Sequence, residues 1–256
     1  MISDLATYIE DLMVPIEGGS FEMGEEKEKH EVELSSFIMA KYPVTQELYE
    51  KVTGKNPSHF KGAKRPVECV SWYDAIEFCN VLSEKLGYNC FYSIKKGQNN
   101  PENRINWEIS YIDQSDGFRL PTESEWEYAA KGGKHKSFYV FSGSEDLDEV
   151  GWFSENSHIE TKDVDLKKPN ALGLYDMCGN VLEWCWDWYL EFDKEKKKNP
   201  YGPEIGGSRV VRGGSWSLEK SICRVTFRFN YDFLYYITPD SRLNDLGFRL
   251  TRAFTP

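Results

Sequence analysis

The sequence is poor in the residues that most metal and catalytic motifs require. Among 256 residues there are only four histidines, His30, His59, His135 and His158, and each stands in a polar stretch. The six cysteines form no C-x-x-C pair and are not spaced with histidine as in zinc sites. The usual nucleotide-binding, zinc-protease and nucleophile-elbow motifs are absent as well. We therefore interpret the histidines as surface residues and favour buried free thiols over a disulfide scaffold.

Basic charge and long apolar runs are also scarce. The 31 Lys and Arg residues face 42 Asp and Glu residues, which gives a net charge of -11. This balance argues against a nucleic-acid partner, because a phosphate backbone demands clustered cations. No apolar stretch approaches the roughly 18 residues of a membrane span, and the start at Met1 shows no signal peptide. We expect neither a nucleic-acid partner nor a transmembrane segment.

Aromatic residues, by contrast, are abundant, with 15 Phe, 15 Tyr and 8 Trp. Such a chain can bury a core, so disorder is excluded, and no repeat or linker divides residues 1–256. The chain is therefore predicted to form a single α+β domain with two main helices, short strands and much irregular structure.

The strongest local signals are helix caps. Ser71 and Gly87 bracket a helix over 72–86, and the capping box that starts at Thr122 begins another over 123–131. Shorter helices are predicted over 3–12 and after Thr45, and a hairpin or an irregular excursion within 90–116. Alternating or apolar runs predict short strands over the following ranges: 32–39, 117–120, 209–212, 223–229 and 247–251.

One pair of carboxylates suits a local metal site. Asp176 and Glu183 flank a sharp turn at Gly179-Asn180. Carboxylates combined with backbone carbonyls at such a turn are typical of Ca²⁺ sites, which take six to eight oxygens. The alternative is that Glu183 pairs with an arginine in the core. The spacing alone leaves both interpretations open.

Cys223 is the second candidate for chemistry. A reactive cysteine needs a base or a partner thiol, and the preceding cysteine in the sequence is as far back as Cys185. A buried thiol on a strand is therefore the favoured interpretation.

The run from Phe227 to Tyr236 is the third candidate, because six of its ten residues are aromatic. Strand alternation cannot bury Phe233, Leu234, Tyr235 and Tyr236 together, since consecutive side chains point to opposite faces. Exposed aromatic clusters usually mark binding surfaces. The run therefore predicts a binding surface, with an irregular corner of the core as the alternative.

Several stretches in the correct order resemble the formylglycine-generating-enzyme (sulfatase-modifying factor) domain. They include the Gly-Phe-Arg-Leu-Pro-Thr-Glu-Ser-Glu-Trp, Gly-Asn-Val-Leu-Glu-Trp and Arg-Gly-Gly-Ser-Trp motifs. The resemblance covers roughly residues 13–252 and implies a C-type-lectin-like fold. The matching stretches are 13–24, 42–46, 66–75, 117–130, 170–184, 212–216 and 247–250.

What the resemblance implies about metals differs between copper and calcium. The enzymes bind copper with two cysteines five residues apart; the second corresponds to Cys223, but Leu218 occupies the first position. Leucine cannot ligate Cu(I), so we expect no copper and no formylglycine generation. A copper- or thiol-dependent oxidase that acts on a substrate cysteine remains the alternative. For calcium, the resemblance implies one structural Ca²⁺ with the following ligands: Asp176, Gly179, Val181 and Glu183.

The chain also resembles a branch of this family without that chemistry, the variable proteins of diversity-generating retroelements. This resemblance implies that segment 216–246 is diversified around the fixed residues Trp216, Cys223, Arg224 and Arg228. The chain would then be a non-enzymatic binding protein, at the cell surface or secreted, that presents this segment to an unknown protein or surface ligand. The candidate ligand-binding residues are Ser217, Leu218, Ser221, Ile222, Phe227, Phe229, Asn230, Tyr231, Asp232, Phe233, Tyr235, Tyr236, Leu243, Asn244 and Asp245.

Overall fold

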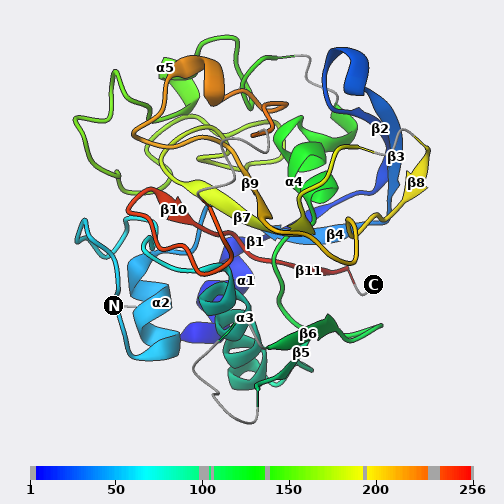
Figure 1. Cartoon of the computed structure of the whole chain (residues 1–256). Helices are drawn as coiled ribbons and strands as arrows, with labels where there is room; N and C mark the ends of the chain where they lie inside the picture. Colours follow the sequence, from blue (N-terminus) through cyan, green and yellow to red (C-terminus); the bar gives the residue numbers. More distant parts are fainter. Residues whose placement is uncertain are drawn as a thin grey trace.

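Short helices and small sheets, joined by long irregular connections, make up the molecule (Figure 1). The computed structural model describes residues 4–97, 104, 107–135, 139–192, 195–229 and 237–254. None of the described helices is long and apolar enough to cross a membrane.

The helices begin and end where the capping residues predict. Thr45 accepts a hydrogen bond from Leu48 N, and Ser71 and Thr122 each form a capping box. Among the described helices α3 is the longest, with 15 residues. Helix α4 has only 8, because the chain turns away at Gly132 and Gly133, both with positive φ. The α-helices are α1 (Leu5–Leu12), α2 (Gln46–Thr53), α3 (Trp72–Leu86), α4 (Glu123–Ala130) and α5 (Leu147–Val150). The 3-10 turns are Glu26–Glu28, Gly133–His135 and Lys220–Ile222.

The described strands form four small sheets. The first is antiparallel, in the order β1 (Met13–Ile16), β4 (Phe37–Ala40), β11 (Thr251–Ala253). The second is mixed, in the order β10 (Leu246–Gly247), β7 (Leu182–Trp188), β9 (Arg209–Arg212). The third has the order β2 (Gly19–Met23), β3 (His30–Leu34), β8 (Lys197–Lys198), and the fourth is the hairpin β5 (Tyr92–Lys95), β6 (Glu108–Tyr111). The predicted hairpin within 90–116 is thus confirmed.

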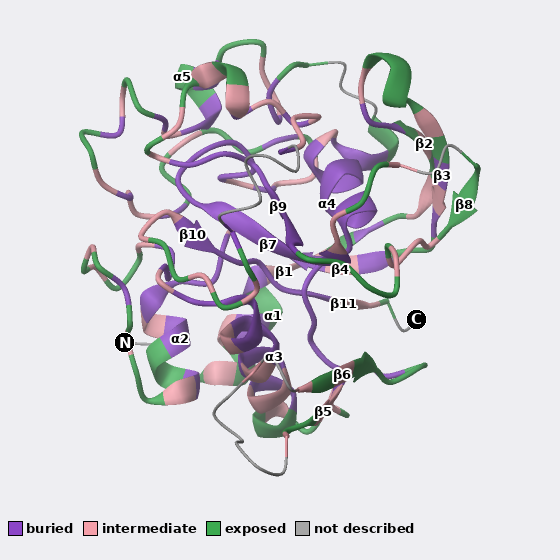
Figure 2. Ribbon diagram, in the orientation of Figure 1, coloured by how far each residue is buried: buried purple, intermediate pink, exposed green. Residues whose placement is uncertain are grey.

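Strand β7 runs through the middle of the molecule, and six of its seven residues are buried (Figure 2). Its side chains alternate between two apolar cores. Trp184 and Trp186 pack in the core that contains α2 and α3, and Cys185 packs in the core beneath α4. Glu183 and Asp187 lie on the same strand, so their carboxyl groups are taken out of water and need compensating partners.

Several predicted strands take a different form. The run 32–39 is split between β3 and β4, which belong to different sheets. Residues 117–120 contribute only an isolated bridge, between Arg119 and Thr251. Residues 223–229 form turns rather than a strand, although burial alternates as predicted at Cys223 and Val225. In place of ladder hydrogen bonds, two of the main-chain carbonyls there accept from a buried arginine, described below.

Candidate ligand-binding surface

The two ends of the predicted variable segment meet in space. The Ser217 hydroxyl donates a 2.8 Å hydrogen bond to Asp245 Oδ2, and the Ser215 hydroxyl donates to the same oxygen at 2.9 Å. The Trp216 indole N–H donates to the carbonyl oxygen of Asn244 at 3.1 Å. Candidates that lie 28 residues apart in sequence therefore share one surface. We call residues 217–222 and 243–245 the two arms of this surface.

The candidates on the arms differ in exposure. Ser217, Ser221 and Leu243 are exposed, and Leu243 is 38% accessible. Leu218 and Ile222 are half-buried and pack against the core around α3. The arms thus present polar groups and part of their apolar side chains to solvent.

The aromatic part of the prediction needs one correction. Phe229 is only 2% accessible and belongs to the core, where its ring meets that of Phe227 edge to face at 5.1 Å. Phe227 is half-buried. Phe229 therefore cannot contact a ligand in this conformation, and the alternative of a core corner applies to it. The remaining aromatic-run candidates lie outside the described residues: Asn230, Tyr231, Asp232, Phe233, Tyr235 and Tyr236.

Neighbouring loops that the sequence did not single out hold the first arm in place. Phe60 packs edge to face against Trp216 at 5.3 Å between ring centroids. Ser157 Oγ donates to the Trp216 carbonyl at 2.9 Å, and Ser154 N donates to the Leu218 carbonyl at 3.0 Å. The exposed Ile159, 77% accessible, follows on the same loop. These contacts depend on tertiary packing, so no local sequence signal points to them.

Arg224 and Arg228, expected as fixed framework residues, are both ion-paired. Arg224 Nη1 lies 2.6 Å from Glu25 Oε2, and Arg228 Nε lies 2.7 Å from Glu123 Oε1. The second Arg228–Glu123 hydrogen bond, at 2.9 Å, makes that pair bidentate. These two residues therefore anchor the segment to the rest of the domain.

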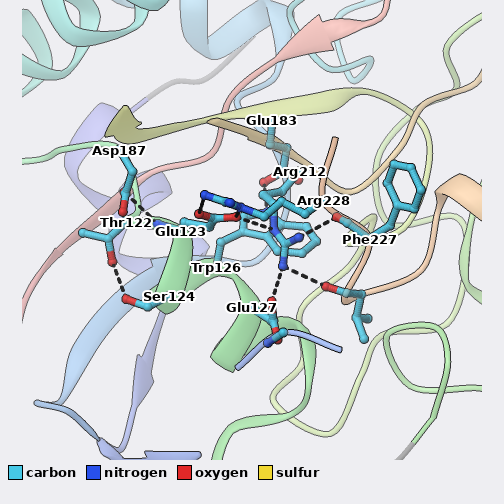
Figure 3. A network of polar contacts seen from close by, with 12 residues as sticks. Thr122, Glu123, Ser124, Trp126, Glu127, Glu183, Asp187, Arg212, Phe227 and Arg228 are labelled. Atoms are coloured by element: carbon cyan, nitrogen blue, oxygen red, sulfur yellow. Dashed lines mark hydrogen bonds and ion pairs between the residues drawn. The ribbon is translucent and has the colours of Figure 1, made fainter. Parts of the chain in front are cut away.

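A fully buried arginine holds the backbone between them (Figure 3). Arg212 is ion-paired to Glu127, and it donates to the carbonyl oxygens of Phe227 at 2.5 Å and Val225 at 3.1 Å. Burial opposes ionisation of Glu127, but Arg212 and Lys131 outweigh it and lower the pKa of Glu127. Both Nη groups of Arg212 are hydrogen-bonded, whereas its buried Nε has no hydrogen-bond partner among the described residues and lies 3.8 Å from Glu123 Oε1. The two main-chain carbonyl oxygens that it binds tie residues 225–227 to α4.

Cys223 sits behind this surface rather than on it. It is buried, and burial raises the pKa of its thiol to about 12. Gly214 packs directly on it, since a Cβ at Gly214 would lie 2.5 Å from Cys223 Sγ. All six cysteines are free, and Leu218 occupies the position that the resemblance assigns to the first of the two copper-binding thiols. A protonated, covered thiol is a weak nucleophile and a poor copper ligand.

The residues predicted to hold calcium form other bonds. Both Glu183 oxygens are occupied, by Arg249 at 2.7 and 2.9 Å and by the Trp126 indole N–H at 2.9 Å. This is the alternative interpretation, an ion pair with a core arginine. Asp176 accepts hydrogen bonds from Asp165 N and Asn180 Nδ2.

The predicted calcium set therefore lacks a free Glu183 carboxylate. Within the described parts of the chain, no group of three or more His, Cys, Asp or Glu residues is arranged to hold a metal ion. A Ca²⁺ held by Asp176 and the carbonyl oxygens of Gly179 and Val181 stays a prediction, in which Glu183 would first have to release Arg249 or Trp126.

Comparison with known proteins identifies the family. The model of the sulfatase-modifying factor enzyme 1-like domain matches residues 4–254. The chain belongs to this family. The match confirms the predicted α+β domain of the formylglycine-generating-enzyme type.

The chain is similar to two relatives in sequence and to one solved structure, and these three proteins carry different names. The chain is 38% identical over 249 residues to the chaperone protein LppX of Paenibacillus barcinonensis, covering 88% of this chain and 86% of the relative. It is 29% identical over 294 residues to the formylglycine-generating enzyme of Mus musculus, covering 95% and 76%. Among solved structures, Treponema denticola variable protein 1 superposes with a TM-score of 0.84 at 36% identity, covering 94% of this chain and 95% of that one.

Proposed function

We propose that the chain is a binding protein whose contact surface includes the two arms, 217–222 and 243–245, and the half-buried Phe227. The observation that carries this proposal is the junction of Ser217 with Asp245. It brings exposed candidates from both ends of segment 216–246 onto one surface, while buried ion pairs hold the backbone behind. A surface that is ordered before binding avoids part of the entropic cost of association.

The relatives support a binding role with a protein partner. The structural likeness to a variable protein at 36% identity extends over 94% of this chain. The relative named a chaperone protein agrees with contact to another polypeptide. The same likeness supports the proposal that the chain lies at the cell surface or outside the cell, which fractionation of intact cells would test.

A second candidate function is the oxidation of a substrate cysteine, because formylglycine-generating enzymes are among the relatives. The covered Cys223 thiol and Leu218 weigh against it. Incubation with Cu(I) and a cysteine-containing peptide separates the two functions. Stoichiometric copper binding together with peptide oxidation would overturn the binding proposal.

The diversification of this surface is tested in the DNA. Codons 216–246 are sequenced from many sister cells, with codons 209–215 and 247–250 as the internal control. We expect changes at adenine positions in the codons of the arms and of the aromatic run, and none in the control codons. An unchanging segment, or changes spread evenly over both regions, would contradict the proposal.

The surface itself is tested by site-specific photo-cross-linking. A photoreactive residue replaces the exposed Ser217 in one variant and the exposed Glu10, on α1, in a matched control. We expect a discrete adduct from Ser217 that excess unlabelled protein competes away, and no such adduct from Glu10. Equal adducts from both positions would show non-specific contact.

A further inference from the structure

A second site lies away from the arms, at the N-terminal end of α4. A pocket of about 380 Å³ opens between α4, the end of β7 and the loop around residue 201. Its walls include the aromatic and proline side chains of Phe192, Trp188, Tyr201, Pro200 and Pro203. Its polar groups are carboxyl groups and cations, which are considered one by one below.

Asp187 is the unusual group in this pocket. Its side chain is nine-tenths buried, since the residue is only 5% accessible. One oxygen, Oδ2, accepts the Glu123 N–H at 2.8 Å (Figure 3). Within the described part of the chain, nothing donates to Oδ1, and no lysine or arginine forms an ion pair with this carboxyl. Gly202 closes over it, because a Cβ at Gly202 would lie 3.0 Å from Oδ1.

The two arginines around Asp187 form no ion pair with it, although the buried Nε of Arg209 has no hydrogen-bond partner in the parts of the chain that the structure describes. Arg228 donates to both Glu123 oxygens and to the Leu190 carbonyl. Arg209 is stacked between Trp72 and Trp188, at 3.7 and 3.6 Å from the ring centroids. Both attract Asp187 only from a distance.

The other charged groups at the pocket do not supply a partner either. Glu123 and Glu125 repel the carboxylate from the α4 side. His30, the exposed Lys197 and the exposed Glu191 complete the charged lining. Burial, followed by the repulsion from Glu123, raises the pKa of Asp187 to about 8.

An anion at this carboxyl would be repelled, and a neutral apolar group would leave Oδ1 unsatisfied. A cation with N–H donors would supply both the missing charge and the missing hydrogen bond. The aromatic walls suit the methylene groups that carry such a cation. We propose that the pocket binds a primary ammonium or guanidinium group against Oδ1 of Asp187.

The first test is a calorimetric titration of the whole chain with pentylamine, with 1-pentanol as the neutral probe of equal length. We expect saturable binding of pentylamine at pH 8 and at least tenfold weaker binding of pentanol. Asp187→Asn should weaken pentylamine binding at least tenfold, while Glu10→Gln, which removes an exposed carboxyl from α1 outside the pocket, should change it less than twofold. Equal binding of both probes, or by wild type and Asp187→Asn, would overturn the proposal, as would no saturable binding.

The second test needs no variant of Asp187. At pH 7 the carboxyl must lose its proton to the buffer when the cation binds, so titration in buffers of different ionisation enthalpy should report close to one proton released. Affinity should fall about tenfold between pH 8 and pH 6.5. His30 also lines the pocket, so His30→Gln must retain the fall. Absence of proton release would overturn the proposal even if Asp187→Asn does not fold.

The source of the cation is resolved by a third titration, with N-acetyl-lysine amide. Binding comparable to that of pentylamine points to a lysine side chain of a polypeptide. Binding of pentylamine alone points to a small free amine. Either result keeps the ammonium assignment. The site shares no residue with the two arms, so its tests and those of the binding surface can fail independently.

Discussion

Two carboxyl groups on β7, four residues apart, have similar burial and opposite surroundings. Glu183 is 0% accessible and receives hydrogen bonds from Arg249 and Trp126 on both oxygens. Asp187 is 5% accessible and receives one, from a backbone N–H. Burial therefore does not distinguish a framework carboxylate from a candidate site. The number of carboxylate oxygens that accept a hydrogen bond does distinguish them. Glu183 closes a network within the core, and Asp187 leaves one oxygen for something outside it.

The largest expected effect comes from breaking the satisfied pair. Arg249→Met leaves the buried Glu183 carboxylate without its cation, which should lower the free energy of unfolding by about 3–5 kcal/mol. Urea unfolding followed by tryptophan fluorescence measures this loss. Lys198→Ala, which removes an exposed partner of Glu33, is the control and should leave the urea midpoint unchanged within error. A small loss for Arg249→Met would mean that water reaches Glu183.

The next effect is a pH dependence that arises at Asp187. With a pKa near 8 in the folded state, the carboxyl keeps its proton where the unfolded chain, with a pKa of about 3.9, has lost it. Wild type therefore loses stability from this group as pH rises from 4 to 8. Asp187→Asn has no carboxyl to titrate, so its free energy of unfolding does not fall in this way. Relative to wild type it should rise across that window by at least about 1.4 kcal/mol, the value of one pKa unit.

The comparison of urea midpoints at pH 5 and pH 8 measures this gain. Asn keeps the carbonyl oxygen that accepts the Glu123 N–H, so the fold should tolerate it. A constant difference between the two proteins at both pH values would show that Asp187 is already ionised and partnered.

A smaller version of the same effect is expected at Asp176. Burial raises its pKa only to about 6, since Asp165 N and Asn180 Nδ2 donate to the carboxylate. The gain of Asp176→Asn on wild type should therefore be complete by about pH 6, while that of Asp187→Asn continues to rise to pH 8. Midpoints at pH 5, 6 and 8 distinguish the two curves. Parallel curves would remove the contrast between the two sites.

The smallest expected difference is between Ser215 and Ser217, whose hydroxyls share Asp245 Oδ2. Ser215 is 0% accessible, so Ser215→Ala should cost about 1 kcal/mol. Ser217 is exposed, and Ser217→Ala should leave the thermal midpoint nearly unchanged. Scanning calorimetry on both variants measures the difference. An equal loss at both positions would place Ser217 with the framework rather than with the contact surface.

The helices were predictable because their signals are local. Ser71 and Thr122 each form a capping box with a residue three positions later, so both partners of the interaction are visible in the local sequence. The strands were less predictable, because pairing depends on which distant segment lies alongside. Nothing within 223–229 reveals that Arg212 takes up its carbonyls. Phe229, at the end of an alternating run, could be read as core or surface until its neighbours were in place.

The candidate site divides in the same way. The family motifs predicted the segment that contains both arms and the framework arginines, and its role in binding stays a prediction. The ion pair of Glu183 was foreseen as an alternative. Asp187 was not singled out, although a signal exists. It is a carboxylate within the buried run Trp-Cys-Trp-Asp-Trp, and a charge among tryptophans demands an explanation. Whether that explanation is an internal arginine or an external ligand depends on contacts that sequence spacing does not contain.

The main-chain bonds behind the arms have a consequence for how the surface can change over generations. Five candidate positions accept a hydrogen bond at their main-chain carbonyl oxygen. The pairs, donor first, are Ser154–Leu218, Arg212–Phe227, Cys69–Leu243, Trp216–Asn244 and Leu182–Asp245. Every amino acid carries this oxygen. A substitution at Leu218, Phe227, Leu243 or Asn244 can therefore change the side chain while the main-chain hydrogen bond is retained. Asp245 differs, because its side chain also accepts the Ser217 and Ser215 hydroxyls.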